Sequence, residues 1–383
     1  MLKLNPMNEN ENTIKNNKSV KRLLPGFLWL LLIPATYVLV QLANDNPSFV
    51  EKVYSGAIFK GVSAILPFQY FPFVSFFEII LLFGPITLLV CLIVFIVRII
   101  KNKPNRSWRI VKVIRNFLIV LAVAYFLFYL LWGFNYSRMS YGEIARLPVQ
   151  KSSTEELKVL CQSLIERTNE ARSRLPSADD NTLELPLSTS ELQSITKNAY
   201  KKATKDSIPG IFTTLASPKP LKISRFVSYT GITGIYIPYT AESNYNNAIP
   251  MPSIGSTICH ELAHRQGFAR EDEANFISYL VCINSSNDYL NYSGLLLATI
   301  NSMNMLYAND QDSHRELYSL YSEEVLADLK KNRFYWQEHS GAVEETFTNL
   351  NDSYLKGNNL PDGVKSYGRM VDLLLALQRQ ENQ

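Results

Sequence analysis

The chain has 383 residues, of which 47% are hydrophobic, and it carries 38 basic and 34 acidic side chains. The net charge of +4 is too small to indicate a nucleic-acid-binding protein, so we expect no nucleic acid among its partners. The four cysteines have no CxxC spacing, and we expect no disulfide framework.

Three apolar runs predict three transmembrane helices, at about residues 23–42, 73–100 and 113–134. Each run is long enough to cross the ~30 Å hydrocarbon core of a bilayer as a helix. The first run follows a basic stretch, as the apolar part of a signal peptide does. It is long, however, and no small-residue cleavage site follows it, which favours an uncleaved anchor.

The charges between the runs predict the orientation. Residues 98–115 carry seven basic side chains and no acidic one, whereas the loop at 43–72 carries two of each. Basic loops stay in the cytoplasm, so the tail at 1–22 and segment 98–115 are predicted to be cytoplasmic. We therefore expect a multi-pass cell-membrane protein, with an anchor at 23–136 held in the lipid bilayer and an extracytoplasmic domain at 137–383.

The pattern after residue 137 is mainly helical. Ser153 and Glu156 have the spacing of a capping box, and the segment from 157 to 175 repeats apolar residues at helical intervals. Another helix is expected at about 191–204, and the chain after residue 256 again favours helices.

Residues 210–252 interrupt the helical pattern and favour a small β element of two or three strands. Its extended segments are expected at 226–229 and 234–240. Pro238 cannot donate a ladder hydrogen bond, so its strand is expected at a sheet edge.

The motif that carries chemistry is His260-Glu261-Leu262-Ala263-His264. On a helix, residues four apart lie on one face, so both imidazoles can bind one metal ion. Glu261, beside the first of them, can then take a proton from an attacking water. The chain has only four histidines, which makes a chance match rare. The motif predicts a Zn²⁺-dependent hydrolase.

A third ligand is expected from the segment that follows. Gly267 can end the helix and turn the chain back, and a second helix is predicted from about Glu271. Glu271 lies on a small, polar stripe of that helix, whereas Glu273 lies on a more apolar one. We therefore favour Glu271 as the ligand and keep Glu273 as the alternative. Asn275, one turn after Glu271, can orient a ligand histidine.

The string HELAHRQGFAREDEANFISYL resembles the signature of the DUF3810 family, bacterial membrane proteins of unassigned function. The resemblance extends to the three apolar runs and to short stretches at 132–136, 234–236 and 366–374. The pattern at 271–275 is also similar to the glutamate helix of gluzincin peptidases, although Asn275 replaces their aspartate. These likenesses imply a zincin-like fold, but no substrate.

We therefore expect three transmembrane helices followed by a mainly helical α+β, zincin-like metallopeptidase domain. His260, His264 and Glu271 would bind Zn²⁺, and Glu261 would act as general base and then as proton donor. Tyr367, in a short polar break before a helix, is the expected oxyanion donor. The substrate would be a peptide or envelope protein, cleaved at a peptide or related amide bond. The alternative is a metal-binding envelope sensor or scaffold without hydrolytic activity.

Overall fold

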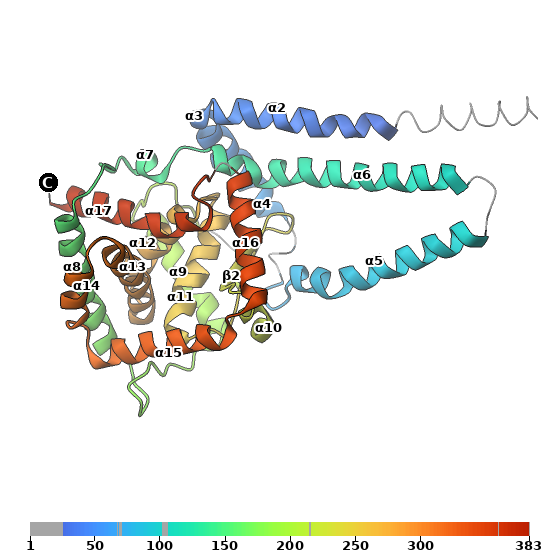
Figure 1. Ribbon diagram of the computed structural model, residues 1–383. Helices are drawn as coiled ribbons and strands as arrows, with labels where there is room; N and C mark the ends of the chain where they lie inside the picture. The colour runs from blue at the N-terminus through green and yellow to red at the C-terminus, as the bar shows by residue number, and fades with distance from the viewer. Residues whose placement is uncertain are drawn as a thin grey trace, which may run out of the picture.

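The protein is described here by a computed structural model that covers residues 26–382, except 67, 69, 70, 102–105, 214, 215 and 359. The predicted cytoplasmic tail at 1–22 and the start of the first predicted span lie outside the described residues. Long helices project together from one side of a mostly helical domain (Figure 1).

Two helices of the described chain are by themselves long and apolar enough to cross a membrane. They are α5 (Phe76–Lys101), which continues through Pro85, and α6 (Arg106–Leu131). A third candidate is bent by 96° between residues 28–44 and 47–65, and counts as a span only if both arms are taken together. Its first arm comprises η1 (Leu28–Leu31) and α2 (Leu32–Asn44), and α2 lies beside α6 (Figure 1).

Residues 47–65, which belong to the loop predicted at 43–72, are helical instead. They form α3 (Pro47–Phe49), the π-helix η2 (Val50–Phe59) and α4 (Lys60–Ile65). Their apolar side chains pack with residues from the end of α6 and from the domain. This second core comprises Val50, Tyr54, Phe59, Trp132, Tyr136, Tyr236, Ala241 and Ala269. The candidate spans are thereby packed onto the domain as well as being linked to it by the chain.

After η4 (Gly133–Ser137), the chain is built mainly of helices, as predicted. Ser153 and Glu156 do form a capping box at the start of α8. The helices are α7 (Tyr141–Ala145), α8 (Thr154–Ser173), α9 (Thr189–Lys205), α10 (Ser224–Ser228), α11 (Met251–Arg265), α12 (Glu271–Ile283), α13 (Asp288–Asn309), α14 (Gln311–Tyr318), α15 (Glu323–His339), α16 (Ala342–Gly357), η5 (Gly363–Arg369) and α17 (Met370–Glu381).

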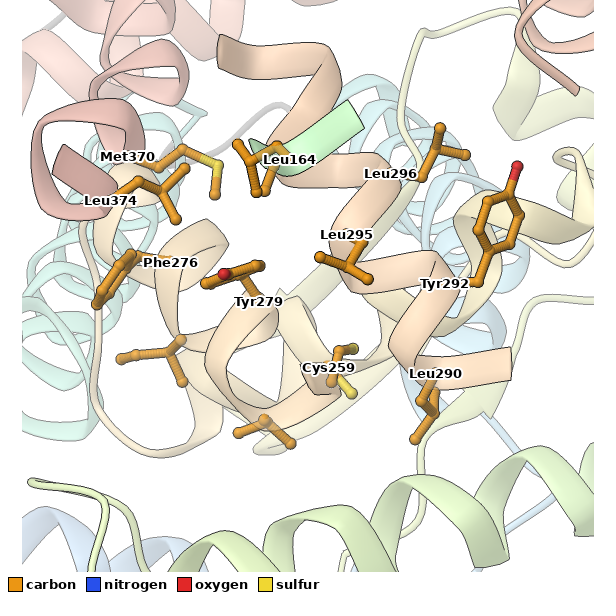
Figure 2. Packing of buried hydrophobic residues seen from close by; sticks show 14 of the residues in the cluster. Leu164, Cys259, Phe276, Tyr279, Leu290, Tyr292, Leu295, Leu296, Met370 and Leu374 are labelled. Carbon is orange, nitrogen blue, oxygen red and sulfur yellow. The ribbon is translucent and has the colours of Figure 1, made fainter. Parts of the chain in front are cut away.

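The main core lies where α8, α11, α12, α13 and α17 meet. Figure 2 shows its side chains, with Tyr279 and Cys259 between the helices and Leu295, Leu164 and Met370 around them. Cys259 and Cys282 are both buried and both free. Burying this much apolar surface holds α11 and α12 in one relative position, and those two helices carry the predicted metal ligands.

A small sheet lies beside α11, as expected for residues 210–252. Its order in the described chain is β1 (Lys219–Pro220), β3 (Glu242–Tyr245), β2 (Gly234–Ile237), with β1 parallel and β2 antiparallel to β3. β2 is an edge strand, as predicted, but it ends at Ile237 and residues 238–240 form a turn instead of continuing it.

The expectation of extended structure at 226–229 was wrong. Ser224–Ser228 forms the short helix α10, in which the Ser228 hydroxyl donates a 3.1 Å hydrogen bond to the carbonyl of Ser224. Ser228 is fully buried, and its hydroxyl also accepts a 3.0 Å hydrogen bond from the side chain of Asn246, so tertiary packing overrides the strand propensity of this short segment.

Candidate metal centre

The two histidines of the motif lie at the end of the buried helix α11. Their ring centroids are 4.6 Å apart, as the one-turn spacing predicts. Gly267 follows the helix with a φ of +84°, a conformation that glycine adopts without strain. A Cβ there would also lie 2.9 Å from Oδ1 of Asn135. The glycine therefore allows the close turn that leads into α12.

Glu271, the first residue of α12, brings its carboxylate to both histidines. Its Oε2 lies 3.1 Å from Nε2 of His260 and 3.4 Å from Nε2 of His264. These three residues form the only cluster of metal-ligating side chains found in the described part of the chain, with one ligand atom from each within 4.8 Å of the others. Their chemistry and spacing fit a zinc ion held by two imidazoles and a carboxylate.

Glu273, the alternative ligand, is directed elsewhere. Its Oε1 accepts hydrogen bonds from the backbone of Tyr141, at 2.8 Å, and from the guanidinium of Arg270, at 2.9 Å. Of the two glutamates that the sequence left open, the structure brings Glu271 alone to the histidines.

The other nitrogen of each imidazole is occupied by a neighbouring group. Nδ1 of His260 lies 2.8 Å from Oδ1 of Asn275, as predicted, and Nδ1 of His264 lies 2.7 Å from the carbonyl of Phe268. These acceptors favour the tautomer that carries its proton on Nδ1. Nε2 of each ring is then the atom free to bind a metal.

The charges of the cluster reinforce one another. Burial opposes protonation of His264, but the nearby Glu271 carboxylate outweighs it and raises the pKa of His264 to about 9. Burial likewise opposes ionisation of Glu271, yet the two histidines hold the pKa of its carboxyl well below its usual range. The Glu271 carboxylate is therefore ionised, and it lies beside imidazoles that can carry a proton or bind a metal ion.

Glu261 lies between the cluster and the edge strand β2. It is 3% exposed, and its Oε2 has no hydrogen-bond partner. Burial raises the pKa of Glu261 to about 7, with the histidines lowering it and Glu271 raising it further. A buried carboxyl with this pKa can both accept and return a proton near neutral pH.

Aromatic side chains that the sequence did not single out as site residues surround the cluster. The Trp132 ring lies edge-on to that of His264, with centroids 5.8 Å apart, and it also packs on Tyr236. The hydroxyls of Tyr136 and Tyr354 are 3.1 Å apart. The Tyr136 ring packs edge-on against Trp132, with centroids 6.4 Å apart, and this places both phenols near the cluster. Burial is the main cause that raises the pKa of each phenol, and Glu271 contributes to both.

These aromatics differ in how visible they were in the sequence. Trp132 and Tyr136 belong to an aromatic group at the end of the third apolar run, which could have marked them. Tyr354 comes from α16, about 80 residues further along the chain than Glu271, and no local pattern marks it. The predicted oxyanion donor Tyr367 lies in η5, but its side chain is outside the described structure.

Glu242, the first residue of β3, has a structural role. Its carboxylate pairs with Lys219 in the buried sheet. The same carboxylate accepts hydrogen bonds from the backbone of Phe76, at 3.0 Å, and of Phe77, at 3.2 Å. It thereby satisfies the free N–H groups at the start of α5 and fixes that candidate span to the sheet.

Comparison with known proteins assigns the chain to a family. A family model described as "Protein of unknown function (DUF3810)" matches residues 54–375, which include both α5 and α6 and nearly all of the domain. No curated protein and no solved structure matches the chain. The match covers most of the sequence, together with every residue of the candidate metal centre, and the chain therefore belongs to the DUF3810 family.

Proposed function

We propose that the protein is a membrane-anchored zinc metallopeptidase that hydrolyses a peptide or related amide bond outside the cytoplasm. Three helices would anchor it in the cell membrane, with the N-terminus in the cytoplasm and the domain on the other side. The distribution of basic residues between the apolar runs supports this orientation.

The observation that carries the proposal is the position of Glu261. Two imidazoles and one carboxylate are enough to bind zinc, and binding alone requires no further acid. Yet a second buried carboxylate lies next to the cluster with one oxygen unpartnered. Burying an ionisable carboxyl costs free energy, and a catalytic role accounts for one placed beside the metal-binding cluster. This favours hydrolysis over the alternative of a metal-binding sensor or scaffold.

The chain's own residues can supply most of the chemistry. His260, His264 and Glu271 would hold zinc, which when bound polarises a substrate carbonyl and lowers the pKa of water. Glu261 would take the proton of the attacking water and pass it to the leaving amine. Burial raises the pKa of Glu261 above the usual range of a carboxyl, which favours the protonated form that the second step requires.

A phenol beside Glu271 can stabilise the oxyanion that develops on the substrate carbonyl. Tyr354 suits this role because it is 41% exposed and lies near the cluster. Its hydroxyl is protonated at neutral pH, as that of any tyrosine is, and is therefore able to donate. Tyr367 remains the candidate from the sequence, and replacing each tyrosine by phenylalanine separates the two.

The proposal is tested on the full chain purified in detergent. We expect about one equivalent of zinc in the wild type and in Glu261→Gln, and little in His260→Ala or Glu271→Ala. Hydrolysis of a random-sequence peptide mixture, read by mass spectrometry, should be lost in all three variants. Equal activity of wild type and Glu261→Gln would make the site structural, and zinc well below one equivalent in the wild type would remove the metal centre.

The orientation has its own test. A reporter that is active only outside the cytoplasm, fused after Gln383, should be active. A reporter that works only in the cytoplasm should be silent at the same position. The reverse result would place the domain in the cytoplasm.

A further inference from the structure

Helix α16 carries an exposed apolar stripe. Val343, Phe347, Leu350 and Tyr354 are spaced by four, three and four residues and therefore lie on one face of the helix. Their exposed fractions are 53%, 40%, 60% and 41%. Four large apolar side chains in one exposed row are unusual on a surface that faces water.

The other side of α16 attaches the helix to the domain. Leu355 is fully buried, and Oδ1 of Asp352 accepts a 3.1 Å hydrogen bond from the backbone of Val364. Glu344 packs against Gly231, where a Cβ would lie 3.1 Å from Cγ of the glutamate. The docked side of the helix is thus defined, and the stripe does not face the core.

The stripe lies where the candidate spans leave the domain. In Figure 1, α16 runs across the face from which α5 and α6 project, roughly perpendicular to them. The ring of Tyr354 packs edge-on against Phe128 of α6, with centroids 6.2 Å apart. Just after the helix, Asn358 accepts a hydrogen bond from the hydroxyl of Tyr129, at 3.4 Å. The apolar surface of α6 therefore continues onto α16.

A contact from the loop after β2 shows how far the domain reaches along α6. The hydroxyl of Tyr239, a residue that is 44% exposed, donates a 3.1 Å hydrogen bond to the carbonyl of Ala124. Ala124 precedes the end of α6 at Leu131 by seven residues, which is about 10 Å along a helix axis. This part of the domain surface lies alongside the apolar length of the candidate span.

We propose that α16 lies flat in the surface of the bilayer, on the side where the domain stands, with Val343, Phe347 and Leu350 entering the apolar boundary. The partner of this face is the lipid itself. Helices that bind in this plane bury one apolar face to a depth of about 5–10 Å and keep their polar face outside. The stripe of α16 and its direction across the spans match that arrangement.

The proposed position of α16 also affects where the candidate metal centre lies. Tyr354, the last residue of the stripe, shares a hydrogen bond with Tyr136, and both phenols lie near Glu271. A helix bound to lipid along its stripe would therefore hold the cluster close to the bilayer surface. Whether a substrate is cleaved at that surface rests on the proposed function. The contact between α16 and lipid does not, because it requires no catalysis.

The lipid contact is tested with nitroxide labels on the full chain, one protein per phosphatidylcholine nanodisc. The background is Cys91→Ser, because the other three cysteines are buried. Labels are placed by Leu350→Cys and, as a second stripe position, Phe347→Cys. The matched control is Glu345→Cys, an exposed position of the same helix outside the stripe. Accessibility to oxygen and to a water-soluble nickel chelate is then compared.

We expect the ratio of oxygen to nickel-chelate accessibility to be several-fold higher at 347 and 350 than at 345. Equal ratios at the three positions would place the stripe in water and overturn the proposal. If the labels at 347 and 350 are shielded from both reagents, protein covers the stripe and the proposal is likewise wrong. Because the readout is independent of zinc and of hydrolysis, its failure is distinct from failure of the proposed peptidase.

Discussion

Gly234, the first residue of β2, lies directly against the side chain of Glu261. A Cβ built on Gly234 would lie 2.7 Å from Cγ and 2.8 Å from Cδ of the glutamate, closer than real Cβ atoms approach their neighbours. The edge strand and the proposed general base therefore share one small space. A side chain at residue 234 has to displace one of them.

Gly234→Ala is accordingly expected to displace the Glu261 carboxylate without removing a metal ligand. Zinc content should stay near one equivalent, whereas peptide hydrolysis should fall at least about tenfold, because a displacement of about 1 Å is costly in catalysis. The matched control is Gly61→Ala in α4, where a Cβ would meet no atom within 4 Å. Unchanged hydrolysis in Gly234→Ala would show that Glu261 does not need its present position.

Asn275→Ala should weaken zinc binding by about 10- to 100-fold, because His260 loses the acceptor that orients its ring. Asn275→Asp should retain or tighten binding, since a carboxylate is the stronger acceptor for an imidazole N–H. Competition with a fluorescent zinc chelator measures both. Asn349→Ala, at an exposed position of α16, is the control. Equal zinc affinities of Asn275→Ala and the wild type would show that Asn275 is not needed to orient His260.

Zinc affinity is expected to rise with pH. In the metal-free protein the pKa of His264 is raised to about 9, so this side chain is protonated at neutral pH. Zinc binds neutral imidazole and must displace that proton, so affinity should increase by up to about tenfold per pH unit below pH 9 and level off above it. Calorimetry in buffers of different ionisation enthalpy should detect release of about one proton at pH 7.5. If zinc binding releases no proton, His264 is already neutral in the metal-free site and the prediction is wrong.

Glu242→Gln should destabilise the protein by about 3–5 kcal/mol, because it leaves the buried ammonium of Lys219 without its counter-ion. It also weakens the bonds to the start of α5, so thermal unfolding in detergent should begin at a clearly lower temperature. The control Asp312→Asn breaks the exposed pair with Arg315 and should change little. Similar midpoints for the two variants would mean that the buried pair contributes no more than the exposed one.

Local features were readable from the sequence because their causes are local. The uninterrupted apolar runs indicated α5 and α6, since length and hydropathy alone decide whether a helix can cross a bilayer. The capping box at Ser153 and the glycine turn at residue 267 each depend on a few adjacent residues. The spacing of His260 and His264 likewise requires only that the motif be helical.

The secondary structure of residues 47–65 and 226–229 was predicted wrongly because it depends on contacts with distant parts of the chain. Whether a short segment becomes a helix is decided by what it packs against. Val50, Tyr54 and Phe59 find their partners in Trp132 and Tyr236, far along the chain. No pattern within the segment itself contains that information.

The sequence by itself determined which residue types could form a metal centre and that apolar helices accompany it. Only the tertiary structure decided between Glu271 and Glu273, because the choice depends on the angle at which α12 leaves the turn at Gly267. It also decided that Trp132 and Tyr354 lie beside the cluster, from segments more than 80 residues away on either side. Such contacts arise from the packing of whole helices, and local residue spacing does not encode them.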